Sequence, residues 1–510
     1  MKRQNFLVLC GAILATMTLS TGRSYADDSS RYIETESQVI TEHETKINGK
    51  RVNYSAETGT QPVWNDEGDA VATLHYTYYK RNGTKDDTTR PLLISFNGGP
   101  GSASVWMHIA YTGPKILNID DEGYPLQPYG IKSNPYSVLD VADILYVNPV
   151  NTGYSRVLRN AEGKLPSKDQ QQKMFFGVNA DIKYLAEWLN TFVTRKNRWR
   201  SPKYLIGESY GTTRVSGLAL ELQNSQWMYL NGVILVSPTD LGIERDGPVK
   251  MANRLPYFAA AAWHHKLLQS EYQNMPLEEF LPQVESFALN ELMPALAQGG
   301  FISEDKKQAV IKKFAAYSGL SETAIAQNNL AVSTSYYWKE LLRSESKTVG
   351  RLDSRYLGLD SQDSGSSPDY NAELTSWLHS FTPALNYYLR EELNYKTDIK
   401  YNMFGPVHPW DRSNNSTGKN LSEAMAANPY LHVMIQSGYY DGATNYFDAK
   451  YSMWQLDPSG KMKQRLSFKG YRSGHMMYLR RDDLKTANDD IRVFIDASLP
   501  ASNEPAKYSR

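Results

Sequence analysis

The stretch GESYG at residues 207–211 carries residue types that could do nucleophilic chemistry. It closes the apolar run KYLIGE (203–208) and precedes TTRVSGLALELQ (212–223), which we predict to be a strand and a helix. A serine between small residues at such a junction is typical of a nucleophile elbow, a sharp turn that lifts the hydroxyl out of the sheet edge. The helix N-terminus also directs backbone N–H groups at any developing anion. Ser209 is therefore the candidate nucleophile, and the alternative is a plain strand-to-helix turn that happens to carry a serine.

A serine hydroxyl is a weak nucleophile without a base, and His475 is the candidate base. It lies in the Ser-Gly loop RSGHMMY (472–478), directly after the predicted strand RLSFKGY (465–471). We interpret the other histidines as ordinary rim or core residues, because the sequence has no H-E-x-x-H and no other metal-binding spacing.

The histidine needs a buried carboxylate to set its tautomer and to stabilise the imidazolium. Asp441, in SGYYDGATN (437–445), directly follows the predicted strand LHVMIQSG (431–438), which places it on a loop at the carboxyl end of a strand. Asp448 and Asp457 are the rivals, in less suitable positions. The resulting chain order of serine, aspartate and histidine is that of α/β-hydrolases.

A second glycine cluster, FNGGPGS (96–102), closes the apolar run PLLISFN (91–97). A phosphate-binding loop is the rival interpretation, but the terminal Lys-Ser/Thr of that motif is absent. A tight loop with free N–H groups beside a nucleophile elbow indicates half of an oxyanion hole. The backbone N–H of Tyr210, which follows the nucleophile, would supply the other half.

The elements that must position these residues are short apolar runs bounded by Gly, Pro or Asn, a pattern that favours strands buried on both faces. Those runs are PLLISFN (91–97), DILYVNPV (143–150), KYLIGE (203–208), NGVILVS (231–237) and LHVMIQSG (431–438). Between the second and third runs, one helical stripe of apolar residues is formed by Val178, Ile182, Leu185, Leu189 and Phe192. Strands alternating with helices predict an α/β fold with a mostly parallel central sheet flanked by helices.

Two further segments do not show this alternation of buried strands and helices. Residues 38–80 alternate apolar and polar side chains, with turn signals at Asn48-Gly49 and Asn82-Gly83, which predicts antiparallel strands ahead of the parallel sheet. Between about 256 and 429 the sequence is helical in character, with a loop by composition at 360–371. We predict that this segment is a mainly helical lid inserted before the final strands.

The composition excludes some functional classes. The 510 residues, of which 41% are hydrophobic, suffice for one large domain with an insertion. Lysine plus arginine equals aspartate plus glutamate, at 55 each, so nothing in the charge balance indicates a nucleic-acid or anionic-membrane partner.

The N-terminus predicts export. Lys2 and Arg3 precede the short apolar stretch from Phe6 to Leu19, and Ser24-Tyr25-Ala26 is a small-x-small cleavage site, so we expect a signal peptide over 1–26 and a periplasmic or extracellular protein. An uncleaved membrane anchor is the alternative. The single cysteine, Cys10, lies inside this segment, so the mature chain would have no disulfide and no thiolate metal site.

Five ordered motifs resemble those of the serine carboxypeptidase family of α/β-hydrolases, over roughly Tyr54 to Phe494. The motifs are FNGGPGS (96–102), NPVNTGYS (148–155), GESYG (207–211), SGYYDGATN (437–445) and SGHM (473–476). The segment NRLPYFAAAAWHHKL (253–267) resembles the bacterial branch in particular.

The resemblance implies a role for each matching residue. Ser209, Asp441 and His475 would form the catalytic triad, and Gly99 and Tyr210 would donate backbone N–H groups to the oxyanion. Asn97 and Glu208 would hold the free α-carboxylate of the last substrate residue, which makes the enzyme an exopeptidase. A protonated carboxyl can donate a hydrogen bond to that carboxylate, whereas an ionised one would repel it.

One departure from the family pattern bears on pH. The family usually places a second glutamate before the Gly-Pro pair of AYTGP (110–114), and here Tyr111 takes that place. The carboxyl pair that shares a proton is thereby lost, so we expect Glu208 to ionise more readily than in relatives.

Together these features predict a secreted serine-type carboxypeptidase that removes C-terminal residues from peptides with a free C-terminus, with no metal or cofactor implied. The alternatives are another α/β-hydrolase (an esterase, acyltransferase or aminopeptidase) or a non-catalytic binding protein on a hydrolase scaffold. The expected organisation is a signal peptide (1–26), a first core part (27–255), the lid (256–429) and a second core part (430–510).

Overall fold

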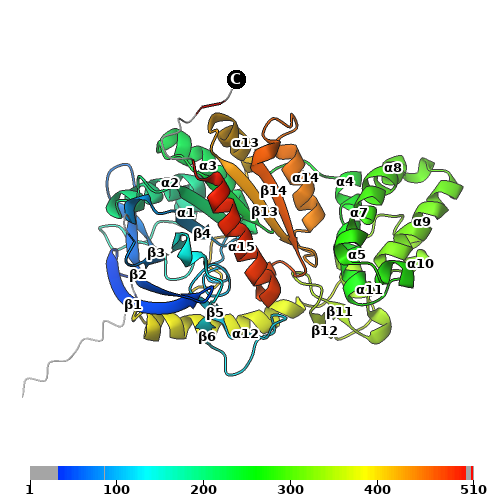
Figure 1. Ribbon diagram of the computed structural model, residues 1–510, viewed down its shortest axis with the longest axis horizontal. Coiled ribbons are helices and arrows are strands. Elements are labelled where there is room, and N and C mark those ends of the chain that lie inside the picture. Colours follow the sequence, from blue (N-terminus) through cyan, green and yellow to red (C-terminus); the bar gives the residue numbers. More distant parts are fainter. Residues whose placement is uncertain (1–30, 32, 85–86, 501–506, 509–510) are drawn as a thin grey trace, which may run out of the picture. The chain divides into compact units, whose positions relative to one another are not determined.

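A mixed sheet forms the centre of the computed structural model, which describes residues 31, 33–84, 87–500 and 507–508 (Figure 1). The strands of this sheet are β1 (Ser37–Ile47), β2 (Lys50–Trp64), β3 (Ala70–Arg81), β4 (Leu92–Phe96), β7 (Asp143–Val147), β8 (Arg156–Val157), β9 (Lys203–Glu208), β10 (Gly232–Val236), β13 (His432–Gly438) and β14 (Leu466–Tyr471). Side by side they follow the order β1-β2-β3-β7-β4-β9-β10-β13-β14, and β8 pairs with β3. Two small ladders lie apart from it, β5 (Lys115–Leu117) with β6 (Ile131–Ser133) and β11 (Thr348–Val349) with β12 (Leu357–Gly358).

The N-terminal strands are antiparallel, as the alternating pattern predicts. β1 pairs with β2, β2 with β3 and β3 with β7, each in antiparallel register. Asn48 and Gly49 form the two-residue turn between β1 and β2, with φ of 47° and 76°. Both values are positive, which is what a tight hairpin requires and what the Asn-Gly pair adopts readily.

From β7 to β14 all neighbouring strands are parallel. The five apolar runs and RLSFKGY predicted from the sequence are β4, β7, β9, β10, β13 and β14. In register, Phe96 lies opposite Gly207, and Gly438 lies opposite Tyr471. The carboxyl ends of β4, β9, β13 and β14 therefore meet along one edge of the sheet, where the candidate site residues follow.

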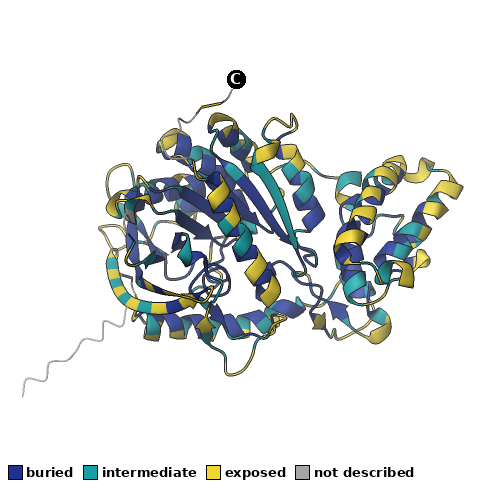
Figure 2. Ribbon diagram, in the orientation of Figure 1, coloured by how far each residue is buried: buried dark blue, intermediate teal, exposed yellow. Residues whose placement is uncertain are grey.

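Some of the helices cover both faces of the sheet, and others pack beside it. The α-helices of the described residues are α1 (Lys168–Phe175), α2 (Val178–Arg195), α3 (Tyr210–Ser225), α4 (Pro248–Ala252), α5 (Leu255–His264), α6 (Ser270–Gln273), α7 (Leu277–Phe287), α8 (Met293–Gln298), α9 (Glu304–Ser318), α10 (Glu322–Gln327), α11 (Thr334–Glu340), α12 (Ala372–Tyr387), α13 (Thr417–Ala427), α14 (Tyr446–Leu456) and α15 (Arg481–Ser498). One apolar core packs α12 and α15 against the sheet, and a second core packs α2, α3, α13 and α14 against the opposite face. Figure 2 shows the central strands buried and the outer faces of the helices exposed.

The predicted helical stripe belongs to α2, and all five of its residues are buried. The two faces of one strand divide between the two cores, since Tyr204 and Ile206 of β9 join the first and Leu205 joins the second. A strand buried on both faces has no room for polar alternation, which explains its continuous apolar run.

The segment between 256 and 429 packs in three places. Helices α5, α7 and α9 form a third apolar core of their own, and Figure 1 shows them (green) beyond the side of the sheet where β14 and α14 lie. The later helices α12 and α13 pack instead into the first and second cores. The helices of the predicted lid are thus shared among three cores, and the boundaries of the lid stay a prediction.

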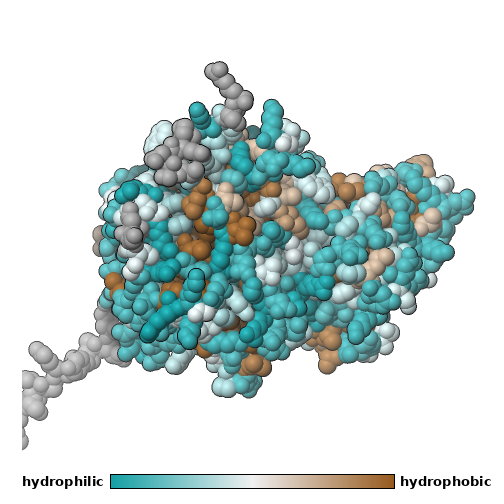
Figure 3. All heavy atoms as spheres, in the orientation of Figure 1, coloured by the Kyte–Doolittle hydropathy of each residue, from teal (hydrophilic) through white to brown (hydrophobic). Residues whose placement is uncertain are grey.

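Among the described residues, no helix is both long enough and apolar enough to cross a membrane. The predicted signal peptide over 1–26 lies outside the described residues. Hydrophilic residues cover most of the face in Figure 3, with apolar patches between them.

Candidate active site

Ser209 stands at a sharp turn between β9 and α3, with φ of 57° and ψ of −125°. A positive φ is unusual for a serine and marks a backbone conformation that the surroundings must hold in place. The backbone N–H of Ser209 donates to the carbonyl of Val236, at 3.0 Å. A Cβ added to Gly207 would lie 2.2 Å from the carbonyl oxygen of Gly211, so the turn closes only with glycine at position 207. These features are those of a nucleophile elbow.

His475 lies in the loop after β14, and its Nδ1 is 2.7 Å from Oδ2 of Asp441. Asp441 follows β13, is fully buried and accepts backbone N–H bonds from Ala443 and Thr444 at 2.8 and 3.1 Å. The hydroxyl of Thr444 donates to the same carboxylate at 2.8 Å. An Nδ1–H that donates to Asp441 leaves Nε2 unprotonated, which is the tautomer that a general base needs.

Two opposing effects set the pKa of His475. Burial lowers it, and the charge of Asp441 together with its hydrogen bond raises it, so that the pKa lies above its usual value. The two rival carboxylates lie elsewhere: Asp448 accepts from Asn445 and Asn253, and Asp457 accepts from backbone and hydroxyl groups of its own loop. Asp441 is therefore the carboxylate that contacts His475.

A pocket of about 240 Å³ joins the ends of these strands. Its lining includes four of the predicted site residues, namely Gly99, Glu208, Ser209 and His475. Its other walls are Gly98, Ser102, Trp106, Arg351, Leu352, Leu374, Trp377, Phe404, Ala443, Thr444 and Met476. The predicted nucleophile, the base and the acid of GESYG thus share one cavity, and Asp441 lies behind the histidine.

The glycine loop packs directly on the elbow. A Cβ at Gly98 would lie 2.5 Å from the backbone nitrogen of Tyr210 and 2.9 Å from Cβ of Ser209, so a larger residue there would displace the turn. Gly99, the next residue, has φ of 104°, a region that favours glycine. The phenol of Tyr210 does not line the pocket, and its hydroxyl accepts a hydrogen bond from the indole of Trp410 at 2.9 Å.

A buried ion pair ties this loop to α3. The guanidinium of Arg214 lies 2.6 Å from the carboxylate of Asp181 on α2, and both side chains are buried. Arg214 also donates to the carbonyls of Asn97 and Pro100, at 2.9 and 3.3 Å. One side chain of the helix that begins at the elbow therefore holds two backbone carbonyls of the glycine loop.

Glu208 is buried, and two side chains bind its carboxyl group. The amide of Asn97 donates to Oε1 at 2.9 Å, and the hydroxyl of Tyr478 donates to Oε2. Burial raises the pKa of Glu208 to about 7, although the nearby His475 and the two hydrogen bonds oppose the rise. The carboxyl group is therefore partly protonated at neutral pH. Asn97 itself is buried against Glu208 and does not line the pocket.

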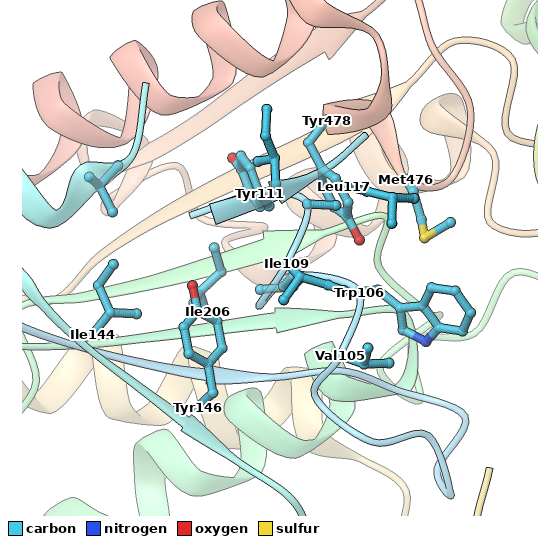
Figure 4. Packing of buried hydrophobic residues seen from close by; sticks show 14 of the residues in the cluster. Val105, Trp106, Ile109, Tyr111, Leu117, Ile144, Tyr146, Ile206, Met476 and Tyr478 are labelled. Atoms are coloured by element: carbon cyan, nitrogen blue, oxygen red, sulfur yellow. The ribbon is translucent and has the colours of Figure 1, made fainter. Parts of the chain in front are cut away.

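Tyr111 is buried beside Tyr478, whose hydroxyl binds Glu208 (Figure 4). Its ring stacks on that of Tyr478, with 4.7 Å between centroids and an interplanar angle of 10°. Its hydroxyl donates to Gln436 at 2.6 Å. Tyr478, and not a second carboxyl, is thus the partner of Glu208 on this side. The sequence reasoning missed Tyr478, although its place three residues after His475 is a usable signal.

Within residues 33–84 and 87–500, no group of three or more His, Cys, Asp or Glu side chains is arranged to hold a metal ion. The pocket combines the serine and histidine side chains, a protonatable carboxyl group and an apolar wall. Such a set suits acyl transfer at a substrate that carries a negative end.

Curated relatives share part of the chain. Serine carboxypeptidase-like 16 of Arabidopsis thaliana is 29% identical over 209 residues, which cover 39% of this chain and 44% of that protein. Serine carboxypeptidase-like 36 of the same plant is 30% identical over 166 residues, which cover 32% of this chain and 31% of that protein. The chain thus spans less than half the length of these relatives in the matched regions.

Among solved structures, Kex1(Δ)p, a prohormone-processing carboxypeptidase from Saccharomyces cerevisiae, has a similar fold. The TM-score is 0.50 at 15% sequence identity, covering 87% of this chain and 91% of that one. The predicted α/β-hydrolase fold is confirmed, and the bacterial branch stays a prediction. The family model described as serine carboxypeptidase matches residues 48–476, most of the chain, and this protein therefore belongs to the serine carboxypeptidase family.

Proposed function

We propose that the protein is a serine-type carboxypeptidase that releases C-terminal residues from peptides through an acyl-enzyme. The observation that carries the proposal is the shared pocket, in which Ser209, His475 and the buried Glu208 face one cavity. A serine and a histidine alone would suit many ester and amide substrates. A neutral carboxyl group beside them favours a substrate with a free carboxylate at the reacting end.

In the proposed acylation step, Oγ of Ser209 attacks the last peptide carbonyl while Nε2 of His475 takes its proton. The backbone N–H groups of Gly99 and Tyr210 bind the resulting oxyanion. His475 then gives the proton to the leaving amine, and the C–N bond breaks. The last residue leaves as a free amino acid, and the remaining peptide stays as an ester on Ser209.

In the second step, water attacks this ester, with His475 again as the base, and the shortened peptide is released. Asp441 holds the imidazole in place and stabilises its positive form in both steps. The protonated Glu208, held by Asn97, binds the terminal carboxylate and so places the last peptide bond at Ser209. We propose further that the protein acts outside the cytoplasm, on the basis of the N-terminal pattern over 1–26.

The test compares Ser209→Ala with a matched control, Ser216→Ala, whose buried hydroxyl lies in α3, the helix directly after Ser209, and makes no hydrogen bond within the described chain. Wild type and the control should release C-terminal amino acids and react with a fluorophosphonate probe, and Ser209→Ala should do neither. Peptides amidated at the C-terminus should be cleaved much more slowly, because the amide cannot satisfy Glu208 as a carboxylate does.

Other outcomes would contradict the proposal in distinct ways. Equal cleavage of amidated and free peptides would indicate an esterase or another peptidase. Labelling of Ser209→Ala by the probe would remove this serine from the reaction. No labelling of the wild type would favour a binding protein on a hydrolase scaffold.

A further inference from the structure

Arg351 is the cationic side chain in the lining of the pocket that the proposed mechanism does not use. Most of the lining around it is apolar, from Trp106, Leu374, Trp377 and Phe404. An arginine on such a wall is available to a ligand only if the protein does not already satisfy its charge.

The side chain of Arg351 is exposed, and within the described residues it has no hydrogen bond or ion pair. Its backbone, by contrast, is held on both sides. The carbonyl of Arg351 accepts from the N–H of Gly442, next to Asp441, at 3.0 Å. The neighbouring Leu352 accepts from the N–H of His475 at 2.6 Å. The loops that carry Asp441 and His475 therefore hold the backbone of Arg351 in place. Its guanidinium group can still reach into the pocket.

The charge of Arg351 acts on Glu373, but the two side chains form no ion pair within the described residues. Glu373 lies behind the wall, where it accepts from the N–H of Leu352 at 2.9 Å, and its other oxygen has no hydrogen-bond partner in the described residues. Burial raises the pKa of Glu373, and that of Glu208, to about 7. Both carboxyl groups are thus partly neutral near neutral pH, while a guanidinium stays charged.

We propose that Arg351 determines specificity by binding the carboxylate of an acidic side chain, Asp or Glu, in one of the two substrate residues that flank the scissile bond. The inference rests on the proposed function. The terminal α-carboxylate already has a partner in Glu208, so the guanidinium is left for a second negative group. Its planar donors suit a carboxylate, which they can bind through two parallel hydrogen bonds.

The test measures kcat/KM for peptides that carry Glu, Gln or Lys at the last or at the penultimate position. Wild type should prefer Glu to Gln about tenfold at one of the two positions, the range of a hydrogen bond to a charged group. Arg351→Gln should remove that preference and leave the Gln peptide unchanged. Arg351→Glu should reverse it in favour of Lys. Arg51→Gln, an exposed arginine paired with Glu44 on the N-terminal hairpin, is the control and should behave as wild type.

The proposal is overturned if Arg351→Gln leaves the Glu-to-Gln ratio unchanged at both positions. It is also overturned if that variant slows every peptide equally, because Arg351 would then bind the α-carboxylate or assist the chemical step. Activity of the wild type on the Gln peptides shows that the carboxypeptidase function itself holds. If the wild type removes the last residue from none of the peptides, the proposed carboxypeptidase function is wrong. This outcome differs from the loss of the Arg351 specificity proposal alone.

Discussion

At the scale of single residues, two groups with shifted pKa values control the proposed chemistry in opposite directions. His475 must be neutral to act as a base, and Asp441 raises its pKa against the effect of burial. Glu208 must be protonated to bind a carboxylate, and burial raises its pKa to about 7. His475 loses its function as the pH falls below its raised pKa, and Glu208 loses its proton as the pH rises through about 7. The two requirements are met together only near neutral pH, so kcat/KM should describe a narrow bell-shaped curve.

Glu208→Gln should remove the fall in kcat/KM on the alkaline side of this curve. In the wild type, kcat/KM should fall as the pH rises through about 7, because Glu208 loses its proton and repels the substrate. The amide of glutamine stays a donor at every pH, so the variant should keep its activity up to the stability limit of the protein. The measurement is kcat/KM for one peptide between pH 5 and 9. A fall with the same midpoint in both proteins would assign the alkaline limb to another group.

Tyr478→Phe should move the alkaline limb to higher pH. The hydroxyl of Tyr478 donates to Glu208 and so lowers its pKa, and without it the carboxyl group should keep its proton longer. Loss of the donor should also cost about 1–3 kcal/mol of unfolding free energy. Tyr111→Phe is the control, because the Tyr111 hydroxyl bonds to Gln436 and not to Glu208. An unchanged limb in Tyr478→Phe would contradict the assignment.

At the scale of elements, the site depends on how α3 is attached to the glycine loop. The nucleophile and the loop after β4 come from neighbouring strands, and the Arg214–Asp181 pair joins them through α2 and α3. Removing one partner of a buried ion pair leaves the other charge without compensation, which costs about 3–5 kcal/mol.

Arg214→Gln should therefore reduce both stability and turnover. The control is Arg198→Gln, which breaks another buried pair, with Asp143, at 2.6 Å and at the opposite ends of the parallel strands. Arg214→Gln should lose about 3–5 kcal/mol of unfolding free energy in urea. Arg198→Gln should lose less, because Asp143 keeps Arg90 as a second partner at 2.9 Å. Only Arg214→Gln should lose kcat beyond that, at a temperature where both proteins are folded. An equal kcat in the two variants would show that the loop keeps its place without Arg214.

Much at this scale could be predicted, because strands buried on both faces leave continuous apolar runs such as KYLIGE. The order of Ser209, Asp441 and His475 along the chain also followed from motifs. The pocket wall could not be predicted in the same way. Trp377 lies in α12 and Arg351 in an irregular segment, and neither has a local pattern that indicates what it will face. Their positions result from long-range packing, which sequence spacing does not record.

At the scale of the whole molecule, buried acids shape the pH dependence of stability. Glu373 is fully buried, and burial raises its pKa from the ordinary 4.5 to about 7. Between these two values the unfolded chain releases a proton that the folded chain retains. The contribution of Glu373 to stability therefore falls as the pH rises from about 4.5 to 7 and then stays constant.

Glu373→Gln should remove this contribution. The difference in unfolding free energy between variant and wild type should shift in favour of the variant by about 2–3 kcal/mol from pH 5 to pH 8. Because all other groups are common to both proteins, their pH dependence cancels in the difference. Urea unfolding at several pH values provides the measurement. A difference that does not vary with pH would mean that Glu373 ionises normally in the folded protein.

The late position of His475 along the chain has a consequence for biosynthesis. A nascent polypeptide that emerges from the ribosome up to Phe404 already contains the serine and the glycine loop, but it lacks both β13 and β14. Under the proposed mechanism such an intermediate cannot hydrolyse anything, since its nucleophile has no base. Hydrolytic activity would therefore arise only after translation has passed His475.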